Sequence, residues 1–223
     1  MTAANEEQMK VDRINISIRK EQLSQLPTVN YSGYITVVDS LEKASSAISH
    51  LNKQQIVGFD TETKPSFRKG RVNKVSLVQI ATERNSFLFR INKIGFCSEL
   101  IGFMENPSIV KVGLSLRDDF HVLHRLAEFT PQGFIELQTL VKEYCISDNS
   151  LQKIYGILFN ERISKGQRLS NWEAERLTPS QQQYASIDAW SCLRIYRHLK
   201  SGLFVPEYSE YILPEEETDE ITE

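Results

Sequence analysis

The sequence predicts an α/β fold, a mixed β-sheet with helices on both faces. Two observations support this class. Short apolar segments typical of strands first form a hairpin-like set and later alternate with segments of helical periodicity. In addition, the 223 residues are 40% hydrophobic and 25% charged, which provides enough apolar material for a buried core and excludes wholesale disorder.

The first half of the chain is rich in predicted strands. In order, we expect a strand at 34–38, a helix at 41–51, strands at 56–59, 75–81 and 86–91, and a helix at 98–105. The first helix is indicated by apolar residues that recur at helical spacing from Leu41 to Leu51. The polar turn Thr82–Asn85 joins two strands and therefore predicts a hairpin.

Helices dominate the second half. We expect a strand at 109–112, a helix at 116–128, a short strand at 134–136, and helices at 138–145, 151–158 and 180–200. Ser115 and Asp118 have the spacing of a capping box and predict a helix start. Thr178, Pro179 and Gln181 predict a second helix start, because Pro suits the first helical position and Gln the third.

Charge divides the chain into an N-terminal arm (1–30), a folded body (31–205) and an acidic C-terminal tail (206–223). The tail contains eight of the 29 acids and no Lys or Arg, so the remaining residues carry about +5. The global pI of 5.9 is therefore weak evidence against an anionic partner. We expect the tail to be a solvated, disordered extension, because it is rich in acids.

Several protein classes are excluded by composition. No stretch approaches the roughly 18 apolar residues of a membrane span, and the N-terminus has no apolar signal segment. We therefore expect a soluble cytoplasmic protein with no membrane partner, and nothing indicates an obligate protein partner. Cys97, Cys145 and Cys192 are too far apart for a disulfide scaffold or a zinc site.

Asp60 and Glu62 follow the apolar segment 56–59. This segment should be buried, and a buried strand that ends in two acids is costly unless the acids are paired or bind a metal. Residues i and i+2 of an extended chain point to the same side, so the two carboxylates converge. Together they suit a hard divalent cation. The alternative is a pair of acids that face water at the end of the strand.

Asp118 and Asp119 lie at the start of the predicted helix at 116–128. The apolar stripe of this helix runs from Leu116 to Leu123, and at about 100° per residue Asp119 falls at its edge. Asp118 points about 100° further round. Helical geometry therefore favours Asp119 as the inward acid and Asp118 as a helix-start acid, although stabilisation of the helix dipole would explain either acid alone.

Tyr184 and Asp188 are four residues apart, early in the predicted helix at 180–200. A phenol and a carboxylate at this spacing share one helical face. A structural hydrogen bond explains the pair by itself, and a role in catalysis is the alternative.

The three motifs have a characteristic order: Asp-x-Glu after a buried strand, Gly-x5-Asp at a helix start, and Tyr-x3-Asp early in a long helix. This order resembles the DEDD superfamily of 3′–5′ exonucleases, which have a ribonuclease H-like fold. Tyr184 is typical of its DEDDy branch. The segments 74–80 and 168–172 match as well. Over about residues 34–200 the chain looks most similar to the exonuclease domain of the Werner syndrome protein, with ribonuclease D as a relative.

The resemblance implies that residues 31–205 are a two-metal-ion 3′–5′ exonuclease domain, which releases nucleoside 5′-monophosphates with DNA as the favoured substrate. Asp60, Glu62, Asp119 and Asp188 would hold two ions of Mg²⁺ or Mn²⁺. Tyr184 would orient or help to deprotonate the attacking water. Ribonuclease D-like trimming of RNA, a non-catalytic module that binds nucleic-acid ends, and a phosphatase of small substrates are the alternatives.

The expected partner is a nucleic acid 3′ end, whose phosphates require positive charge. Basic residues crowd the loops 64–74 and 162–168 beside the motifs, although ordinary surface positions would explain either group alone. The expected substrate-binding residues are Arg68, Lys69, Lys165, Arg168, Gln79 on the following strand, and Thr61, near which the backbone approaches the terminal sugar in this family. Trp172 is either a residue that stacks a base or part of the core.

Overall fold

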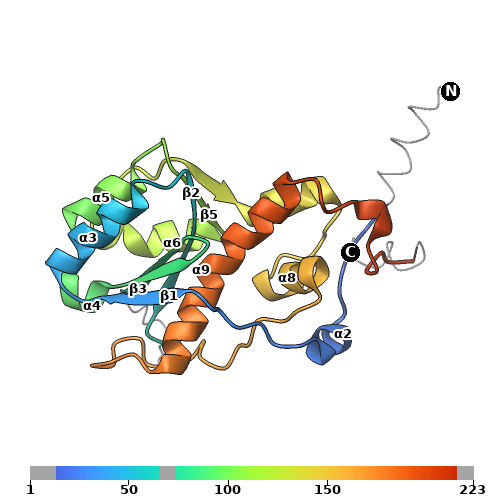
Figure 1. Cartoon of the computed structure of the whole chain (residues 1–223), viewed down its shortest axis with the longest axis horizontal. Helices are drawn as coiled ribbons and strands as arrows, with labels where there is room; N and C mark the ends of the chain where they lie inside the picture. The colour runs from blue at the N-terminus through green and yellow to red at the C-terminus, as the bar shows by residue number, and fades with distance from the viewer. Residues whose placement is uncertain (1–13, 66–73, 215–223) are drawn as a thin grey trace. The chain divides into compact units, whose positions relative to one another are not determined.

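The computed structural model describes residues 14–65 and 74–214, which form two compact units. The larger unit consists of Asn30–Leu137 and Ser164–Arg194, apart from the gap at 66–73, and the smaller one of residues 14–29, 138–163 and 195–214. The elements of both are labelled in Figure 1. The first 13 residues of the predicted arm and residues 215–223 of the predicted tail lie outside the described residues.

The described strands of the larger unit form one six-stranded mixed sheet. They are β1 (Tyr34–Val38), β2 (Ile56–Thr63), β3 (Val75–Ala81), β4 (Asn85–Arg90), β5 (Val110–Gly113) and β6 (Phe134–Glu136). Their order is β1-β4-β3-β2-β5-β6. β3 is antiparallel to β2 and β4, as the hairpin prediction requires, whereas the pairs β1–β4, β2–β5 and β5–β6 are parallel.

The helices follow the predicted positions closely. They are α2 (Lys20–Gln25), α3 (Leu41–Leu51), α4 (Ile91–Ile94), α5 (Ser98–Met104), α6 (Leu116–Leu123), α7 (Leu137–Leu140), α8 (Leu151–Phe159) and α9 (Pro179–Lys200), with 3-10 helices at Val141–Tyr144 and Pro206–Tyr208. The short helices α2 and α4 were not specifically predicted. The predicted helix at 138–145 is divided between α7 and the first 3-10 helix.

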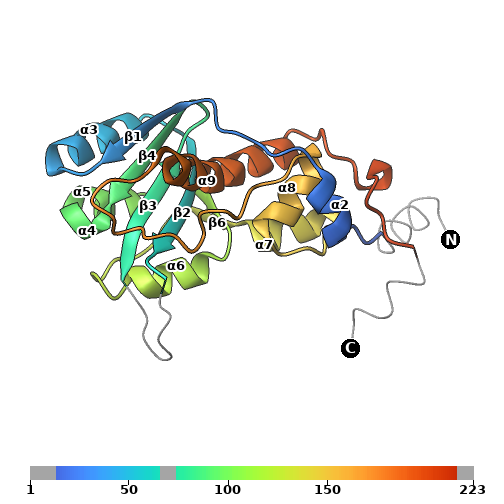
Figure 2. The ribbon, with the colours of Figure 1, turned by 90° about the horizontal axis from the view of Figure 1, so that it is seen from below.

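The two faces of the sheet are covered by different helices, which confirms the predicted fold class. Successive side chains of a strand point to opposite faces. On one face, Val78 and its neighbours pack with buried residues of α3, α5 and α6. On the other, Leu77 and Leu88 pack with Ala185 of α9. Helix α9 crosses the strands in both views (Figures 1 and 2).

Helix α9 approaches β2 closely at Gly58. A β-carbon at this position would lie 1.8 Å from the carbonyl oxygen of Ala189, so only glycine fits. Asp60 and Glu62 point to the same face of β2 as position 58, because side chains alternate along a strand. The close contact between strand and helix therefore holds the third motif beside the first.

The predicted helix at 116–128 is too long, since α6 ends at Leu123. The chain turns at His124, whose ring nitrogens lie 2.7 Å from the carbonyl oxygen of Phe120 and 3.0 Å from that of Phe129. The His124 ring also stacks on the Phe129 ring. These contacts stabilise a turn that apolar periodicity does not reveal.

The smaller unit contains residues 14–29 of the predicted arm. Ile16 is fully buried and forms isolated β-bridges with Ile146 and Ile212. The backbone N–H of Ile18 donates a hydrogen bond to the Asp148 carboxylate at 3.0 Å. The segment that contains Ile16 and Ile18 is therefore packed into the smaller unit.

The sequence indicated neither a disulfide scaffold nor a membrane span. All three cysteines are free thiols, as expected. Among the described helices, none is long and apolar enough to span a membrane.

We expect Gly58→Ala to lower the free energy of unfolding by about 2 kcal/mol or more. Overpacking a core costs about 1–3 kcal/mol, and here the obstacle is rigid backbone. Gly102→Ala is the matched control, because a β-carbon there meets nothing within 4 Å and alanine favours the helix. Urea unfolding measures both variants. Equal stabilities would contradict the close contact between α9 and β2.

Candidate active site

Three carboxylates meet on the sheet face that α9 covers. Oxygens of Asp60, Glu62 and Asp188 lie within 4.8 Å of one another. The predicted strand at 56–59 continues to Thr63, so both acids of the first motif lie within the ladder between β2 and β3 and not beyond its end. Both are only partly exposed. The predicted convergence of these two acids is confirmed.

Helix α9 presents Asp188 from a firmly capped start. The backbone N–H of Gln181 donates to Thr178 Oγ1 at 3.2 Å, and the backbone N–H of Thr178 donates to Gln181 Oε1 at 2.9 Å. This reciprocal pair is the predicted capping box, with Pro179 as the first helical residue. The Gln181 side-chain amide also donates to Ser170 Oγ at 3.0 Å, which ties the preceding loop to the helix.

Tyr184 lies one turn before Asp188, and its hydroxyl donates a hydrogen bond to the Asp188 carboxylate. Trp172 is fully buried, and its ring centroid lies 6.0 Å from that of Tyr184. Trp172 therefore belongs to the core behind Tyr184. The alternative in which Trp172 stacks a base of the substrate is wrong.

Asp119 approaches β2 from the opposite side of the sheet. It is 9% exposed, whereas Asp118 is exposed, as the helical phase predicts. The Thr61 hydroxyl donates a hydrogen bond to the Asp119 carboxylate. Because Thr61 lies between Asp60 and Glu62, this bond joins α6 to the first motif. Asp119 is not one of the three acids that lie within 4.8 Å of one another.

The start of α6 is capped from a distance by Glu136. The predicted capping box of Ser115 and Asp118 is wrong, because Ser115 adopts a left-handed φ of 62° and its side chain makes no capping hydrogen bond. Instead, the Glu136 carboxylate accepts the backbone N–H groups of Ser115 at 3.0 Å and Leu116 at 2.8 Å. A negative charge at this end of a helix is stabilising.

Glu136 is the residue of the site that the sequence-based interpretation missed. It is the last residue of β6, which pairs with β5 immediately before α6. Asp60 was identified as a candidate because it is an acid at the end of a predicted strand. Glu136 also ends a predicted strand, so the same pattern could have indicated it.

Burial and mutual repulsion raise the pKa values of the clustered acids. Burial is the largest cause, and it raises the pKa of Glu62 to about 10, that of Asp119 to about 8 and that of Asp188 to about 7. The pKa of Asp60 lies well above its ordinary value because of burial and, next, the charge of Asp188. The positive charge of Arg168 lowers the pKa of Glu62 and so opposes this trend.

This set of oxygen donors fits hard divalent cations. Carboxylate oxygens are preferred ligands of Mg²⁺ and Mn²⁺, and the cluster contains no thiolate or imidazole that would favour softer metals. Like charges this close repel strongly in a partly buried site, and a divalent cation relieves that repulsion. The acid cluster therefore fits a metal site.

Two of the predicted phosphate-binding residues, Lys165 and Arg168, lie in the chain segment before α9, and both are exposed. The charge of Arg168 acts on Glu62 and lowers its pKa, so Arg168 lies near the acids. Arg68 and Lys69 lie outside the described residues.

Other basic residues of the two predicted loops have structural contacts. The Lys64 ammonium forms an ion pair with Glu173 at 3.0 Å, which connects the end of β2 to the segment before α9. Arg162 belongs to the smaller unit, where its Nε donates to the carbonyl oxygen of Leu26 at 2.9 Å. Basic composition alone does not separate such contacts from substrate-binding positions.

Gln79, which was predicted to bind substrate, is buried within the sheet. It stands opposite Asp60 in the ladder between β2 and β3 and is fully buried. No part of the Gln79 side chain reaches the surface. Gln79 therefore cannot make the predicted direct contact with a terminal nucleotide.

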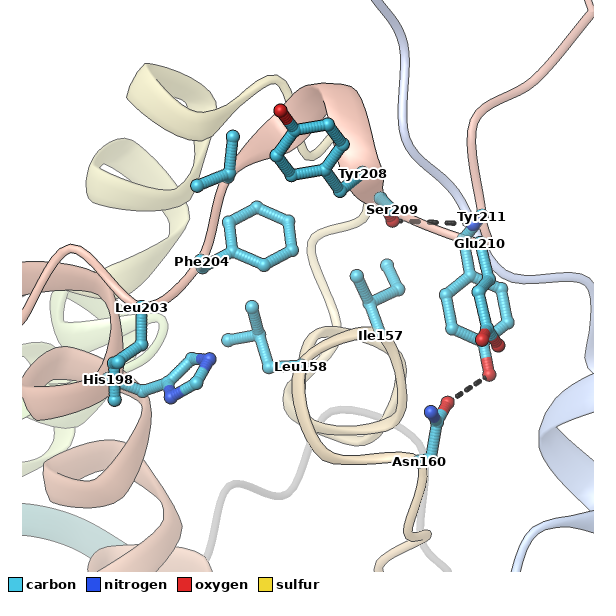
Figure 3. Close-up of a pocket in the computed structure, with 11 residues that line it drawn as sticks. Ile157, Leu158, Asn160, His198, Leu203, Phe204, Tyr208, Ser209, Glu210 and Tyr211 are labelled. Carbon is cyan, nitrogen blue, oxygen red and sulfur yellow. Dashed lines mark hydrogen bonds between the residues drawn. The ribbon is translucent and has the colours of Figure 1, made fainter.

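A separate cavity of about 270 Å³ lies in the smaller unit, between α8 and the chain that follows α9. Apolar and aromatic side chains such as Leu158 and Phe204 point into it, and Tyr211 donates a hydrogen bond to Asn160 Oδ1 at 2.5 Å at its edge (Figure 3). Glu210 is the single carboxylate among its lining residues, so the cavity offers no cluster of acids.

The acid cluster fits a metal site, and comparison with known families gives the class of protein. The sequence profile of the 3'-5' exonuclease family matches residues 35–203. The chain belongs to this family.

Two relatives share about 30% of the matched residues with this chain. The chain is 31% identical over 155 residues to the bifunctional 3'-5' exonuclease/ATP-dependent helicase WRN of Mus musculus, a match that covers 67% of this chain and 11% of the relative. It is 30% identical over 182 residues to a 3'-5' exonuclease of Arabidopsis thaliana, covering 76% of this chain and 62% of the relative. The chain thus spans less than two thirds of the length of these relatives.

Among solved structures, Escherichia coli RNase D superposes with a TM-score of 0.68 at 20% identity, covering 76% of this chain and 44% of that chain. At this identity the likeness shows the fold alone. It confirms the predicted ribonuclease H-like sheet with helices on both faces.

Without divalent cations, the folded protein should lose stability as pH rises. The clustered acids bind protons more tightly in the folded state than in the unfolded chain, where their pKa values are about 4. The stability that these protonated acids contribute to the folded state is therefore complete below about pH 4. It is lost as pH rises toward the pKa of Glu62, which is about 10.

Thermal unfolding between about pH 5 and 9, in EDTA and in saturating Mg²⁺, measures this dependence. We expect a falling melting temperature in EDTA and a flatter profile in Mg²⁺. Identical profiles in the two buffers would contradict the cation site.

Proposed function

We propose that this chain is a metal-dependent exonuclease that hydrolyses the terminal phosphodiester bond at the 3′ end of a nucleic acid, with DNA as the favoured substrate, and releases nucleoside 5′-monophosphates. Residues 31–205 would carry the activity. The observation that carries the proposal is the approach of Asp60, Glu62 and Asp188 within 4.8 Å in a chain of the 3'-5' exonuclease family.

Four acids would hold two cations, with Mg²⁺ or Mn²⁺ as the expected ions. When bound, the cations would supply Lewis-acid stabilisation of the charge that develops on the attacking and leaving oxygens. Asp60 would contribute to both positions, because it lies in the cluster with Glu62 and Asp188 and is adjacent in the chain to Thr61, which binds Asp119. Glu62 and Asp188 would serve one position, and Asp119, held by Thr61, would serve the other.

Tyr184 would orient the attacking water. Its hydroxyl is already directed by the bond to Asp188, and burial together with the nearby carboxylates raises its pKa above the ordinary value of 10.0. A phenol that keeps its proton serves as a hydrogen-bonding partner and not as a base. Of the two roles that the family resemblance implies, orientation of the water is therefore the one we propose.

The substrate would be held by its phosphates. Lys165 and Arg168 are exposed cations in the segment before α9, and the charge of Arg168 reaches Glu62. Contacts of this kind position the nucleic acid backbone without reading its sequence. Arg68 and Lys69 are kept as further phosphate-binding candidates on the basis of the sequence.

Trimming of RNA 3′ ends is the second candidate. Escherichia coli RNase D, which shares the fold, is described as an exoribonuclease involved in structured RNA processing. A digestion of labelled DNA and RNA with matched 3′ overhangs, in Mg²⁺ and in Mn²⁺, decides between the two. Faster release of 5′-monophosphates from DNA supports the proposal, whereas faster release from RNA favours trimming. Binding of either oligonucleotide without shortening would instead indicate a non-catalytic module.

Asp60→Asn should lower the rate of nucleotide release by about a hundredfold or more, because it removes a charge that would act at both cation positions. The same substitution should raise the melting temperature in EDTA, since it relieves repulsion among the acids. Single-turnover assays and thermal unfolding measure the two effects. Unchanged turnover would refute the role of Asp60.

Asp119→Asn should also reduce activity strongly, whereas Asp118→Asn should leave it nearly unchanged. The two acids are adjacent in the chain, but Asp119 is buried and bonded to Thr61 while Asp118 is exposed. Cleavage rates of the two variants at saturating Mg²⁺ provide the measurement. The reverse order of effects would show that α6 presents the other acid.

Removal of Lys165 and Arg168 together should weaken binding of a single-stranded oligonucleotide and make it less sensitive to salt. Each lost phosphate contact should reduce the slope of log affinity against log salt by about 0.7. The double variant Lys53→Ala/Arg84→Ala is the matched control, because both residues are exposed in the larger unit near the opposite end of β2 and β3. Equal slopes for the two double variants would contradict the assignment.

A further inference from the structure

The side-chain amide of Gln79 is buried without a hydrogen-bond partner. Its exposed fraction is 0%, and within the described residues neither Nε2 nor Oε1 forms a hydrogen bond. Leaving such a group unpaired in a protein interior is unfavourable, because it loses its hydrogen bonds to water and gains none in return. Buried polar groups are rarely unpaired in native proteins, so this amide calls for an explanation other than packing.

The sheet register places Gln79 next to the first acid of the cluster. It stands directly opposite Asp60 in the antiparallel pair of β2 and β3, and β-carbons at such positions are about 4.5–5.5 Å apart. Glu62, whose own partner is Leu77, is a diagonal neighbour on β2. On the other side Gln79 faces the apolar Leu88 of β4.

A glutamine suits this position chemically. An ionised carboxylate only accepts hydrogen bonds, and the amide NH₂ group provides two donors without adding charge. A lysine or arginine here would compete with divalent cations for the carboxylates, and an acid would add to their repulsion. A leucine would fill the space but offer no donor.

We infer that Gln79 is a positioning residue, whose amide, unpaired in this structure, would donate a hydrogen bond to the Asp60 carboxylate and orient it when divalent cations are bound. The inference rests on the proposed function, because it assigns Gln79 a role in the same site. It replaces the direct contact with substrate that the sequence suggested. Groups that orient a metal ligand in this way commonly contribute about 10–100-fold in metal affinity or activity.

Ser86 provides a matched comparison. Its hydroxyl is also fully buried and unpaired within the described residues, and it lies on the same sheet face, one strand further from the acids. Its neighbours in register are Ala81 and Ile35, neither of which is charged. Removing either unpaired group should therefore leave stability unchanged or raise it, and only the removal of the Gln79 amide should affect cation binding.

The experiment compares Gln79→Met, which keeps the length of the side chain, with Ser86→Ala and the unmodified chain. Unfolding free energies in EDTA and Mn²⁺ affinities from electron paramagnetic resonance are measured on all three. We expect both variants to be at least as stable as the unmodified chain in EDTA. Gln79→Met should bind Mn²⁺ about 10–100-fold more weakly, and Ser86→Ala should bind it within about twofold of the unmodified chain.

Unchanged Mn²⁺ affinity of Gln79→Met, or an equal loss in Ser86→Ala, would overturn the inference. If Gln79→Met does not fold, Gln79→Asn keeps an amide on a shorter side chain and should show weakened Mn²⁺ binding; full affinity in that variant would overturn the inference as well. Failure of the proposed function is distinguishable, because the unmodified chain itself would then neither bind Mn²⁺ nor shorten oligonucleotides.

Discussion

Carboxylates of like charge repel one another, and the repulsion grows when they are withdrawn from water. The larger unit nevertheless brings Asp60, Glu62 and Asp188 within 4.8 Å of one another. Packing holds them there, since the backbone of α9 lies so close to β2 that position 58 has room only for glycine. Burial and the neighbouring carboxylates raise the pKa values of Asp60 and Glu62. A divalent cation bound among these acids would relieve the repulsion.

Each part of the site is held in place by a different set of hydrogen bonds. The ladder with β3 holds the acids of β2, the reciprocal bonds of Thr178 and Gln181 fix the start of α9, and Glu136 caps α6 behind Asp119. Because these hydrogen bonds lie on separate helices and strands, the geometry of the site depends on the whole sheet and not on one loop. A preorganised arrangement of this kind suits chemistry in which charge is stabilised without rearrangement of the protein.

Features set by local sequence were predictable, and features set by distant contacts were not. The strand at 75–81, the helix at 41–51 and the cap at Thr178 depend on residues close together in the chain, and all three agree with the structure. The Ser115 cap failed because a carboxylate 21 positions away replaced it. The burial of Gln79 depends on the helix that covers its strand, which no pattern within β3 reveals. The candidate acids could be named because the family resemblance joins motifs that are weak individually.

The most direct test is to locate the cations. A crystal of the chain grown or soaked in Mn²⁺ and measured near the manganese absorption edge would show each bound ion as a peak in anomalous difference density. We predict a peak among the oxygens of Asp60, Glu62 and Asp188, and a second peak on the side of Asp119. Density without a peak among these oxygens at saturating Mn²⁺ would contradict the assignment of this cluster as the catalytic centre.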